Sequence, residues 1–394
     1  MEIEEIKFND PKDMEEIEIK KEENMIIEEI KDEELKNEII ENEDKIDFKE
    51  EKFIEVKTNE DLDKINEELD RVEINLISPK ILEKLNTIKF KQLEILSLIN
   101  SGINSIDFLI NESFKSLIIL EIKENKETFK SLDKISQVPF KGLKVLDLSS
   151  NNISSIEEIS KAPFKGLEIL ILSSNHIKEI KPIVEGEFTK LTKLDISDNG
   201  LTSIDSLGVN DNLKTLESLY LNNNKISDIS VLNNEAFKSL KELQLTNNEI
   251  VKIDVMKKAP FTGLLELYLY GNHIESIDAL SNSTLDKLKI LMLSQNQIKD
   301  IKPLEGCPFK QLESLNLFNN IIEDIEVLKK IPFKEIKELD LSFNKIKSVD
   351  ALLLVKFSNL SLLNIEGNDL DYSNKNIKTI YENYNIKFDY ISIF

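Results

Sequence analysis

Few side chains in this sequence have the chemistry for catalysis or metal binding. The chain contains two histidines, His176 and His273, and one cysteine, Cys307. Both histidines directly follow an asparagine of a recurring motif, which predicts exposed turn positions about 20 Å apart, too far to share a metal ion. Cys307 lies where equivalent segments carry Ala162 or Ala259. We therefore interpret it as a small core residue and not as a nucleophile.

Phosphate loops and acid–base pairs are not apparent either. The chain has only 10 glycines, and none of them forms a glycine-rich phosphate loop. Acidic residues are plentiful, but no spacing singles out a general acid and a general base. We therefore predict a protein that is not an enzyme and that binds no metal ion and no cofactor.

The charge balance is strongly acidic. With 51 basic and 74 acidic residues, the chain of 394 residues has a formal net charge of −23. Residues 1–60 contain 24 Asp and Glu against 10 Lys, a net charge of −14, which leaves −9 for the other 334 residues. Nucleic-acid binders need a cationic surface, and anionic membranes attract cationic proteins. The composition therefore argues against both kinds of partner.

A repeated motif organises most of the chain. The pattern L-x-x-L-x-L-x-x-N, as in Leu143 to Asn151, occurs twelve times, and nine of the eleven steps between copies are 24 residues. The alternation in L-x-L predicts a short strand whose leucines point inward. The asparagine follows where the strand ends, so a buried amide there can bond backbone groups that lack ladder partners. Only the first copy lacks this asparagine and has Ser101 instead.

The second half of each unit has its own regular spacing. Apolar residues stand three apart, as in Ile153, Ile156 and Ile159, which suits a 3₁₀ or short helical segment. A phenylalanine stands three residues before the first leucine in ten units, at positions 90, 114, 140, 164, 188, 237, 261, 309, 333 and 357. This recurrence predicts a second column of core side chains beneath the outer surface.

Units of this kind cannot bury their own apolar edges, so they must stack on their neighbours. Strands then lie about 4.8 Å apart on the inner side, and the bulkier return segments on the outer side make the array curve. The motif resembles the leucine-rich-repeat family over about residues 69–370. The resemblance implies an α/β fold, namely a right-handed curved solenoid with a parallel sheet on its concave face and short 3₁₀ or helical segments on its convex face.

Within that family, the units resemble the 22-residue class of intracellular phosphatase-regulatory subunits and bacterial internalins. The segments from Ile226 to Leu232 and from Ile298 to Leu304 are similar to internalin turns. The chain departs from the class by two extra residues per unit and by a P-F-K insertion, as at Pro139. We see no signal peptide, no wall anchor and no apolar run long enough to span a bilayer. With a single cysteine, these features predict a cytoplasmic protein.

Four segments are predicted along the chain. Residues 1–56 form an acidic, low-complexity arm that is either disordered or partly helical, and either a solvated tail or an interaction arm. Residues 57–92 form an N-terminal cap and a degenerate first repeat, with Thr58 and Asp61 spaced for a capping box before a helix over 59–68. Residues 93–370 contain the twelve units, and residues 371–394 form a C-terminal cap with a helix over 376–384.

The concave face is the candidate site, because the residues between the inward leucines point out from the sheet. Most of these are small and polar, but units six to ten carry an aromatic and apolar group with an acidic rim. The group consists of Tyr220, Tyr268, Tyr270, Met292 and Phe318, and the rim includes Glu242, Glu266, Glu338 and Asp340. Aromatic anchors within a polar rim are typical of protein-binding hot spots, although scattered surface aromatics are also ordinary.

A second apolar group lies on the same face near the N-terminal end. It consists of Ile95, Ile99, Ile119, Val145, Ile169 and Ile171. So much aliphatic surface on an exposed face would be unusual. The N-terminal arm, a partner and a second copy of the chain are all candidates to cover it.

We therefore expect a non-catalytic protein-interaction scaffold or regulatory subunit. Its partner would be a protein with a basic and partly apolar surface, held on the concave face. The alternative is an exported adhesion or recognition protein, as the resemblance to internalins implies. The oligomeric state and the identity of the partner are left open by the sequence.

Overall fold

The computed structural model describes residues 52–355, 357–371 and 373–384. The predicted arm up to residue 51, and with it the choice between a tail and an interaction arm, lies outside the described residues. So do residues 385–394 of the predicted C-terminal cap. Lys52 begins a compact unit of its own.

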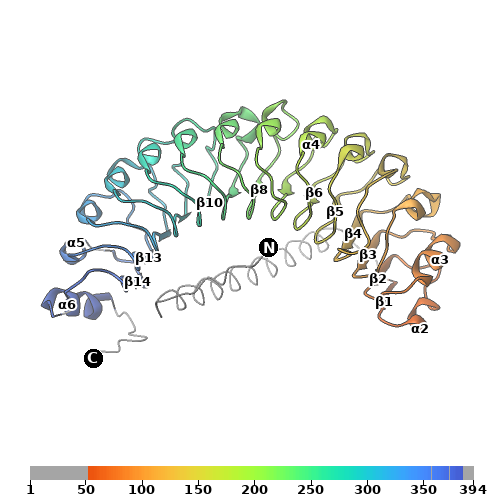
Figure 1. Ribbon diagram of the computed structural model, residues 1–394, viewed down its shortest axis with the longest axis horizontal. Helices are drawn as coiled ribbons and strands as arrows, with labels where there is room; N and C mark the ends of the chain where they lie inside the picture. Colours follow the sequence, from red (N-terminus) through yellow and green to blue (C-terminus); the bar gives the residue numbers. More distant parts are fainter. Residues whose placement is uncertain (1–51, 356, 372, 385–394) are drawn as a thin grey trace, which may run out of the picture. The chain divides into compact units, whose positions relative to one another are not determined.

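The described residues form one curved sheet of 14 parallel strands in sequence order, with strands on the inner side of the curve and short helices on the outer side (Figure 1). This confirms the predicted solenoid and its parallel concave sheet. The strands are β1 (Phe53–Val56), β2 (Arg71–Ile74), β3 (Ile95–Ile99), β4 (Ile119–Lys123), β5 (Val145–Asp147), β6 (Ile169–Ile171), β7 (Lys193–Asp195), β8 (Ser218–Tyr220), β9 (Glu242–Gln244), β10 (Glu266–Tyr268), β11 (Ile290–Met292), β12 (Ser314–Asn316), β13 (Glu338–Asp340) and β14 (Leu362–Asn364).

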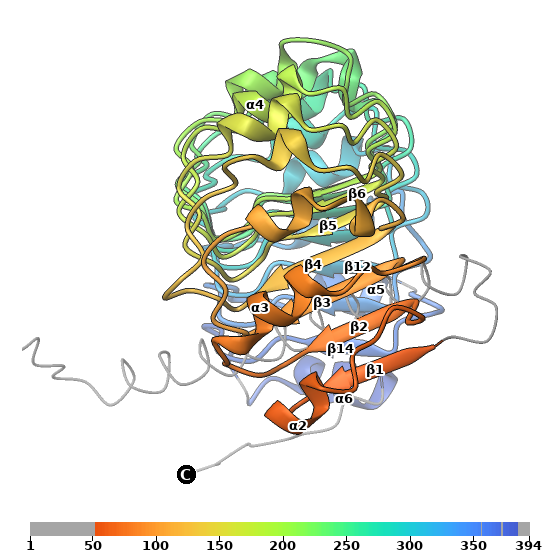
Figure 2. The ribbon, with the colours of Figure 1, turned by 90° about the vertical axis from the view of Figure 1, so that its right-hand side faces the viewer.

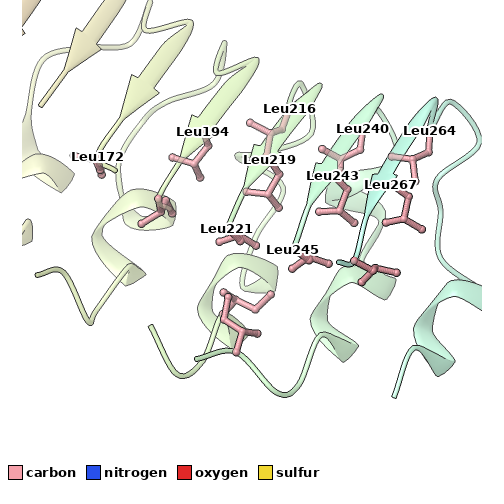
Figure 3. Close-up of a cluster of buried hydrophobic side chains, with 14 of the residues drawn as sticks. Leu172, Leu194, Leu216, Leu219, Leu221, Leu240, Leu243, Leu245, Leu264 and Leu267 are labelled. Carbon is pink, nitrogen blue, oxygen red and sulfur yellow. The ribbon is translucent and has the colours of Figure 1, made fainter. Parts of the chain in front are cut away.

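The repeat length sets the register of the sheet. Leu243 pairs with Leu267, which pairs in turn with Leu291, so residues 24 positions apart stand side by side. The regular repeat length puts equivalent leucines of neighbouring units into rows, one row for each position of the motif (Figure 3). These side chains are fully buried, and each unit thus covers the apolar edge of its neighbour.

The outer segments are short helices, as the spacing of three predicts. In Figure 2 helices lie above and in front of the stacked strands, which is the outer side of the curve in Figure 1. The 3₁₀ helices are η1 (Asp107–Ile110), η2 (Glu112–Phe114), η3 (Ile135–Gln137), η4 (Glu157–Lys161), η5 (Asp205–Gly208), η6 (Ser230–Asn233), η7 (Glu235–Phe237), η8 (Asp254–Lys257), η9 (Asp278–Leu280), η10 (Lys302–Gly306) and η11 (Glu326–Lys329). The α-helices are α2 (Asn59–Leu62), α3 (Lys80–Thr87), α4 (Lys181–Glu185), α5 (Asp350–Leu354) and α6 (Lys375–Tyr384).

The motif asparagines form the predicted ladder. The Asn248 amide nitrogen donates to the carbonyls of Leu221, Leu245 and Thr246 at 3.0–3.1 Å. Its oxygen accepts the backbone N–H of Ile226 at 3.0 Å. The first copy of the motif has Ser101 in place of the asparagine. There the backbone N–H of Ser101 donates to the side-chain oxygen of Asn125, in the next unit, at 2.9 Å. The turns that leave the sheet are thereby held by side chains.

The ten phenylalanines before the leucines are core residues, as predicted. All are at most 5% exposed, and neighbouring rings touch, for example Phe140 and Phe164 with centroids 5.6 Å apart and nearly parallel planes. Two units have a leucine at the equivalent position, Leu213 and Leu285, and both are fully buried. This column fills the space between the sheet and the outer helices.

The ends differ in detail from the sequence-based expectation. The Thr58–Asp61 capping box forms, but α2 ends at Leu62 and not at residue 68. The sheet begins earlier than expected, because β1 pairs with β2 and lies within the segment that we assign to the arm. At the other end, α6 covers the last unit through contacts with α5 and matches the predicted helix to within one residue.

Candidate functional site

Strands β8 to β13 bring the predicted site residues onto one face. On β10, the side chains of Glu266 and Tyr268 lie on the concave side of the sheet, and the buried Leu267 between them lies on the core side. Tyr268 pairs in register with Met292 on β11 and with Gln244 on β9. Tyr220 lies one strand further, next to Gln244. The candidate residues therefore occupy neighbouring strands, as the spacing predicts.

Tyr220 is held by charges on both neighbouring strands. Its hydroxyl donates to the Glu242 carboxylate at 2.6 Å. The Lys193 ammonium nitrogen lies 4.6 Å from the centroid of its ring, within the range of a cation–π contact. The ring is half-buried, so the pair of contacts fixes its orientation while part of it stays accessible.

Tyr268 has a similar arrangement within its own strand. Its hydroxyl donates to the Glu266 carboxylate at 2.7 Å, and the side chain is half-buried. The glutamates that we predict as a rim are therefore hydrogen-bond acceptors for the tyrosines as well. This pairing reduces the number of rotamers that the aromatic rings can adopt.

Burial raises the pKa of Glu242, and hydrogen bonds from Tyr220 and Gln244 oppose that shift. The nearby Glu266 adds to the rise, and Lys193 works against it. The carboxylate is therefore harder to keep ionised than an exposed one. A cationic group brought to this face would stabilise the ionised form.

The other predicted residues are less accessible than expected. Tyr270 is 6% exposed and Phe318 is 8% exposed, while Met292 is half-buried. Asp340 is half-buried, and its carboxylate accepts from the backbone N–H and hydroxyl of Ser342. The accessible part of the predicted patch is therefore narrower than the full set of five side chains and is centred on Tyr220, Tyr268 and Met292.

Sequence reasoning missed Phe343 on this face. The residue stands three positions after the last residue of β13, is 37% exposed, and packs edge-on against Phe318 with ring centroids 5.3 Å apart. The sequence does carry a signal for it. Most units have Asn, Ser, Asp or Gly at this eighth position, and phenylalanine departs from that pattern.

The N-terminal aliphatic group is largely buried. Five of its members, Ile95, Ile119, Val145, Ile169 and Ile171, are between 0% and 4% exposed, and the sixth, Ile99, is half-buried. Which of the three candidates covers this group stays a prediction.

Charged residues lie beside that group. The Lys123 ammonium lies 2.8 Å from Glu121 and 3.5 Å from Asp147. Burial lowers the pKa of Lys123, but attraction to Asp147 and Glu121 outweighs it, so the net pKa is raised. Burial raises the pKa of Asp147. Lys123 thus stabilises two acidic side chains on the concave side of β4 and β5.

The two histidines and the cysteine lie where the sequence predicts. His176 and His273 are exposed. Cys307 is buried, and burial raises the pKa of its thiol to about 12. Within the described ranges, no three His, Cys, Asp or Glu side chains gather as a metal site would require. None of the helices in this part of the chain is long and apolar enough to cross a membrane.

Family models agree with the repeat geometry. A model of leucine-rich repeats in two copies matches residues 189–234 and 286–330, and two further leucine-rich-repeat models match residues 128–177 and 336–355. The chain belongs to the leucine-rich-repeat family. No curated protein is significantly similar to this leucine-rich-repeat chain in sequence.

Solved structures with similar folds include leucine-rich-repeat proteins of several organisms. An internalin (inlF) of Listeria monocytogenes is 25% identical, with a TM-score of 0.61, over 79% of this chain and 84% of its own. A leucine-rich-repeat protein of Leptospira interrogans is 21% identical, with a TM-score of 0.50, over 86% and 90%. The plant peptide hormone receptor RGFR1, solved in complex with RGF2, is 17% identical, with a TM-score of 0.57, over 82% and 50%. The last two similarities concern the fold alone.

Proposed function

We propose that this leucine-rich-repeat protein is a non-catalytic interaction scaffold or regulatory subunit that binds a protein partner on its concave face. Solenoids of this kind offer an extended concave surface for binding. The observation that carries the proposal is the pairing of tyrosines with glutamates on this face. Tyr220 with Glu242, and Tyr268 with Glu266, hold two aromatic rings at half exposure.

Charge supports a partner with a basic and partly apolar surface. From β8 to β14, the third, fifth and seventh positions of the motif carry five acidic side chains and no lysine or arginine. The five are Glu242, Glu266, Glu338, Asp340 and Glu366. Complementary charge speeds association and selects among partners, whereas the apolar contacts supply most of the affinity. The same acidity disfavours nucleic acids and anionic membranes.

A crosslinking experiment tests the assignment of the face. A photoreactive amino acid at position 268 should crosslink a partner in cells, whereas the same group at Val209, which is 66% exposed outside the sheet, should not. The crosslinked protein is then purified and its direct binding is measured. Tyr220→Ala with Tyr268→Ala should weaken that binding at least tenfold, since truncated hot-spot residues cost about 2 kcal/mol or more.

The matched control removes apolar area elsewhere. Val209→Ala with Leu354→Ala truncates two side chains that are 66% and 70% exposed and should leave binding unchanged. All variants should keep the melting temperature of the wild type within a few degrees. Binding that survives the tyrosine changes but is lost in the control variant would place the site on the other face.

The second candidate function is recognition by an exported protein. The similarity to the Listeria internalin over most of both chains favours it. Fractionating cells that produce the protein separates the two, because a scaffold would stay with the cytoplasmic fraction and an exported protein would be recovered outside it. The crosslinked partner would then come from the corresponding compartment.

A further inference from the structure

Phe343 stands in a backbone conformation that aromatic residues rarely adopt. At the eighth position of all twelve units, φ is positive and lies between 43° and 65°. Asn, Gly, Asp and Ser tolerate this left-handed region, and asparagine occupies four of the twelve positions, Asn100, Asn223, Asn247 and Asn319. Phe343 adopts it with φ of 51°. Strained residues of this kind concentrate at functional sites.

The ring of Phe343 is supported by two neighbours. Phe318 packs against it in an edge-on arrangement, with 66° between the ring planes. On the other side, Gly367 occupies the eighth position of the next unit. A Cβ at that position would come within 3.0 Å of ring atoms Cγ and Cδ1. The absence of a side chain at residue 367 therefore makes room for the ring, which is still 37% exposed.

Acidic residues precede this ring on the strand that leads to it. Glu338 and Asp340 lie on β13, the strand that leads to Phe343. The Phe343 backbone N–H donates to the carbonyl of Glu366 at 2.8 Å, which fixes the adjacent turn beside it. Glu338 is exposed and also accepts from the Ser314 hydroxyl at 3.0 Å. A partly exposed ring thus lies at the end of an acidic strand.

We propose that Phe343 binds an arginine side chain of the protein partner, with the guanidinium stacked on the ring and paired with the Asp340 carboxylate of β13. A guanidinium is planar, is weakly hydrated and donates in a fork that matches a carboxylate, so it gains from both contacts at once. A lysine ammonium is a compact, strongly hydrated charge and gains less from the ring. The inference rests on the proposed function, because it specifies one contact of the same concave face.

Fluorine NMR of the full chain tests this contact. The protein is produced with para-fluorophenylalanine, and the resonance of Phe343 is identified by its absence in Phe343→Asn. The probes are acetylated and amidated Gly-Arg-Gly-Arg-Gly and Gly-Lys-Gly-Lys-Gly peptides. We expect the arginine peptide to shift the Phe343 resonance in a saturable way, with an affinity about threefold higher than that of the lysine peptide, whereas the buried Phe140 stays unshifted.

Two variants test whether the preference for arginine depends on the Phe343 ring and not only on the negative charge of the face. Phe343→Asn keeps a residue type that suits positive φ and should fold normally while losing the preference for arginine. Because this variant lacks the fluorine reporter, isothermal titration calorimetry measures the binding of both peptides to it and to the wild type. Gly367→Asn leaves Phe343 in place but displaces its ring, and it should reduce the preference as well. Equal shifts with both peptides, or an unchanged preference in Phe343→Asn, would overturn the proposal. If the tyrosine variants lose the partner but Phe343 does not respond to arginine, the arginine contact alone is wrong.

Discussion

The side-chain oxygen of Asn248 accepts the backbone N–H of Ile226, 22 residues earlier, at 3.0 Å. The same amide donates to carbonyls of its own unit and of the preceding one. One buried side chain thus joins two turns whose backbone groups have left the sheet. The relationship recurs along the solenoid, for example between Asn272 and Ile250 at 3.1 Å.

We expect Asn248→Ala to lower the free energy of unfolding by about 3 kcal/mol, because several buried backbone groups lose their partner at about 1–3 kcal/mol each. Asn248→Asp keeps the shape but cannot donate, and it should be at least as destabilising since it buries a charge. Urea denaturation followed by circular dichroism measures both changes.

The control for the asparagine ladder is Asn359, whose exposed amide bonds only the Glu335 carboxylate among the contacts described. Asn359→Ala should cost less than about 0.5 kcal/mol, as surface substitutions usually do. If Asn248→Ala were as mild as this control, the ladder would not be a main source of stability at the turns.

The phenylalanine column allows a graded prediction. Phe164→Ala should destabilise the protein by about 3–5 kcal/mol, because it removes a fully buried ring and leaves a cavity. Phe164→Leu should cost markedly less, since Leu213 and Leu285 already fill the equivalent space in two units. Thermal and urea unfolding compare the two variants. Equal losses would mean that ring stacking on Phe140, and not volume, sets the stability there.

The thiol of Cys307 should be unreactive in the folded protein. Its Sγ donates to the carbonyl of Pro303 at 3.4 Å, and burial raises its pKa to about 12. At pH 8, far below this pKa, the thiolate is about a thousandfold rarer than for a thiol with a pKa near 9. Labelling with a thiol reagent at pH 8 should therefore be at least a thousandfold slower than in urea. Rapid labelling without urea would show that the outer segment opens readily.

Much of this fold follows from periodicity alone. A spacing of 24 residues fixes which leucines pair across β9 to β11, because a parallel ladder with a constant unit length has one register. The buried phenylalanines and asparagines are likewise predictable, since each recurs at one position of the unit. The strand β1 is not predictable in this way, because it precedes the first recognisable copy.

The candidate site is only partly predictable. Alternation along the strands places Tyr220 and Tyr268 on the concave face, but their hydroxyl partners depend on rotamers that the pattern does not contain. The spacing cannot show that Tyr270 and Phe318 are buried, because exposure depends on what packs around each ring. The alternation along the strands does not reveal Phe343, because this residue and its backbone conformation belong to the turn and not to the strand.

Glu242 provides a prediction for pH dependence. Burial raises the pKa of its carboxyl above the usual range, so the folded protein binds this proton more tightly than the unfolded chain does. The stability that it contributes therefore falls as the pH rises from the ordinary carboxyl pKa through the raised value. We expect Glu242→Gln to raise the free energy of unfolding at pH 8, and the gain to disappear toward pH 4. Urea denaturation across this range measures the difference between the two proteins.

The comparison with wild type matters because Asp147, Asp195 and Asp340 have pKa values raised by burial as well. Their titration changes the free energy of unfolding of both proteins with pH in the same direction. The difference between wild type and Glu242→Gln therefore reports on Glu242 alone. Glu249→Gln, at an exposed turn, controls for the loss of one negative charge from an acidic chain. The prediction would be contradicted if Glu242→Gln raised the free energy of unfolding more at pH 5 than at pH 8. That result would mean that folding favours the charged carboxylate, and hence lowers its pKa.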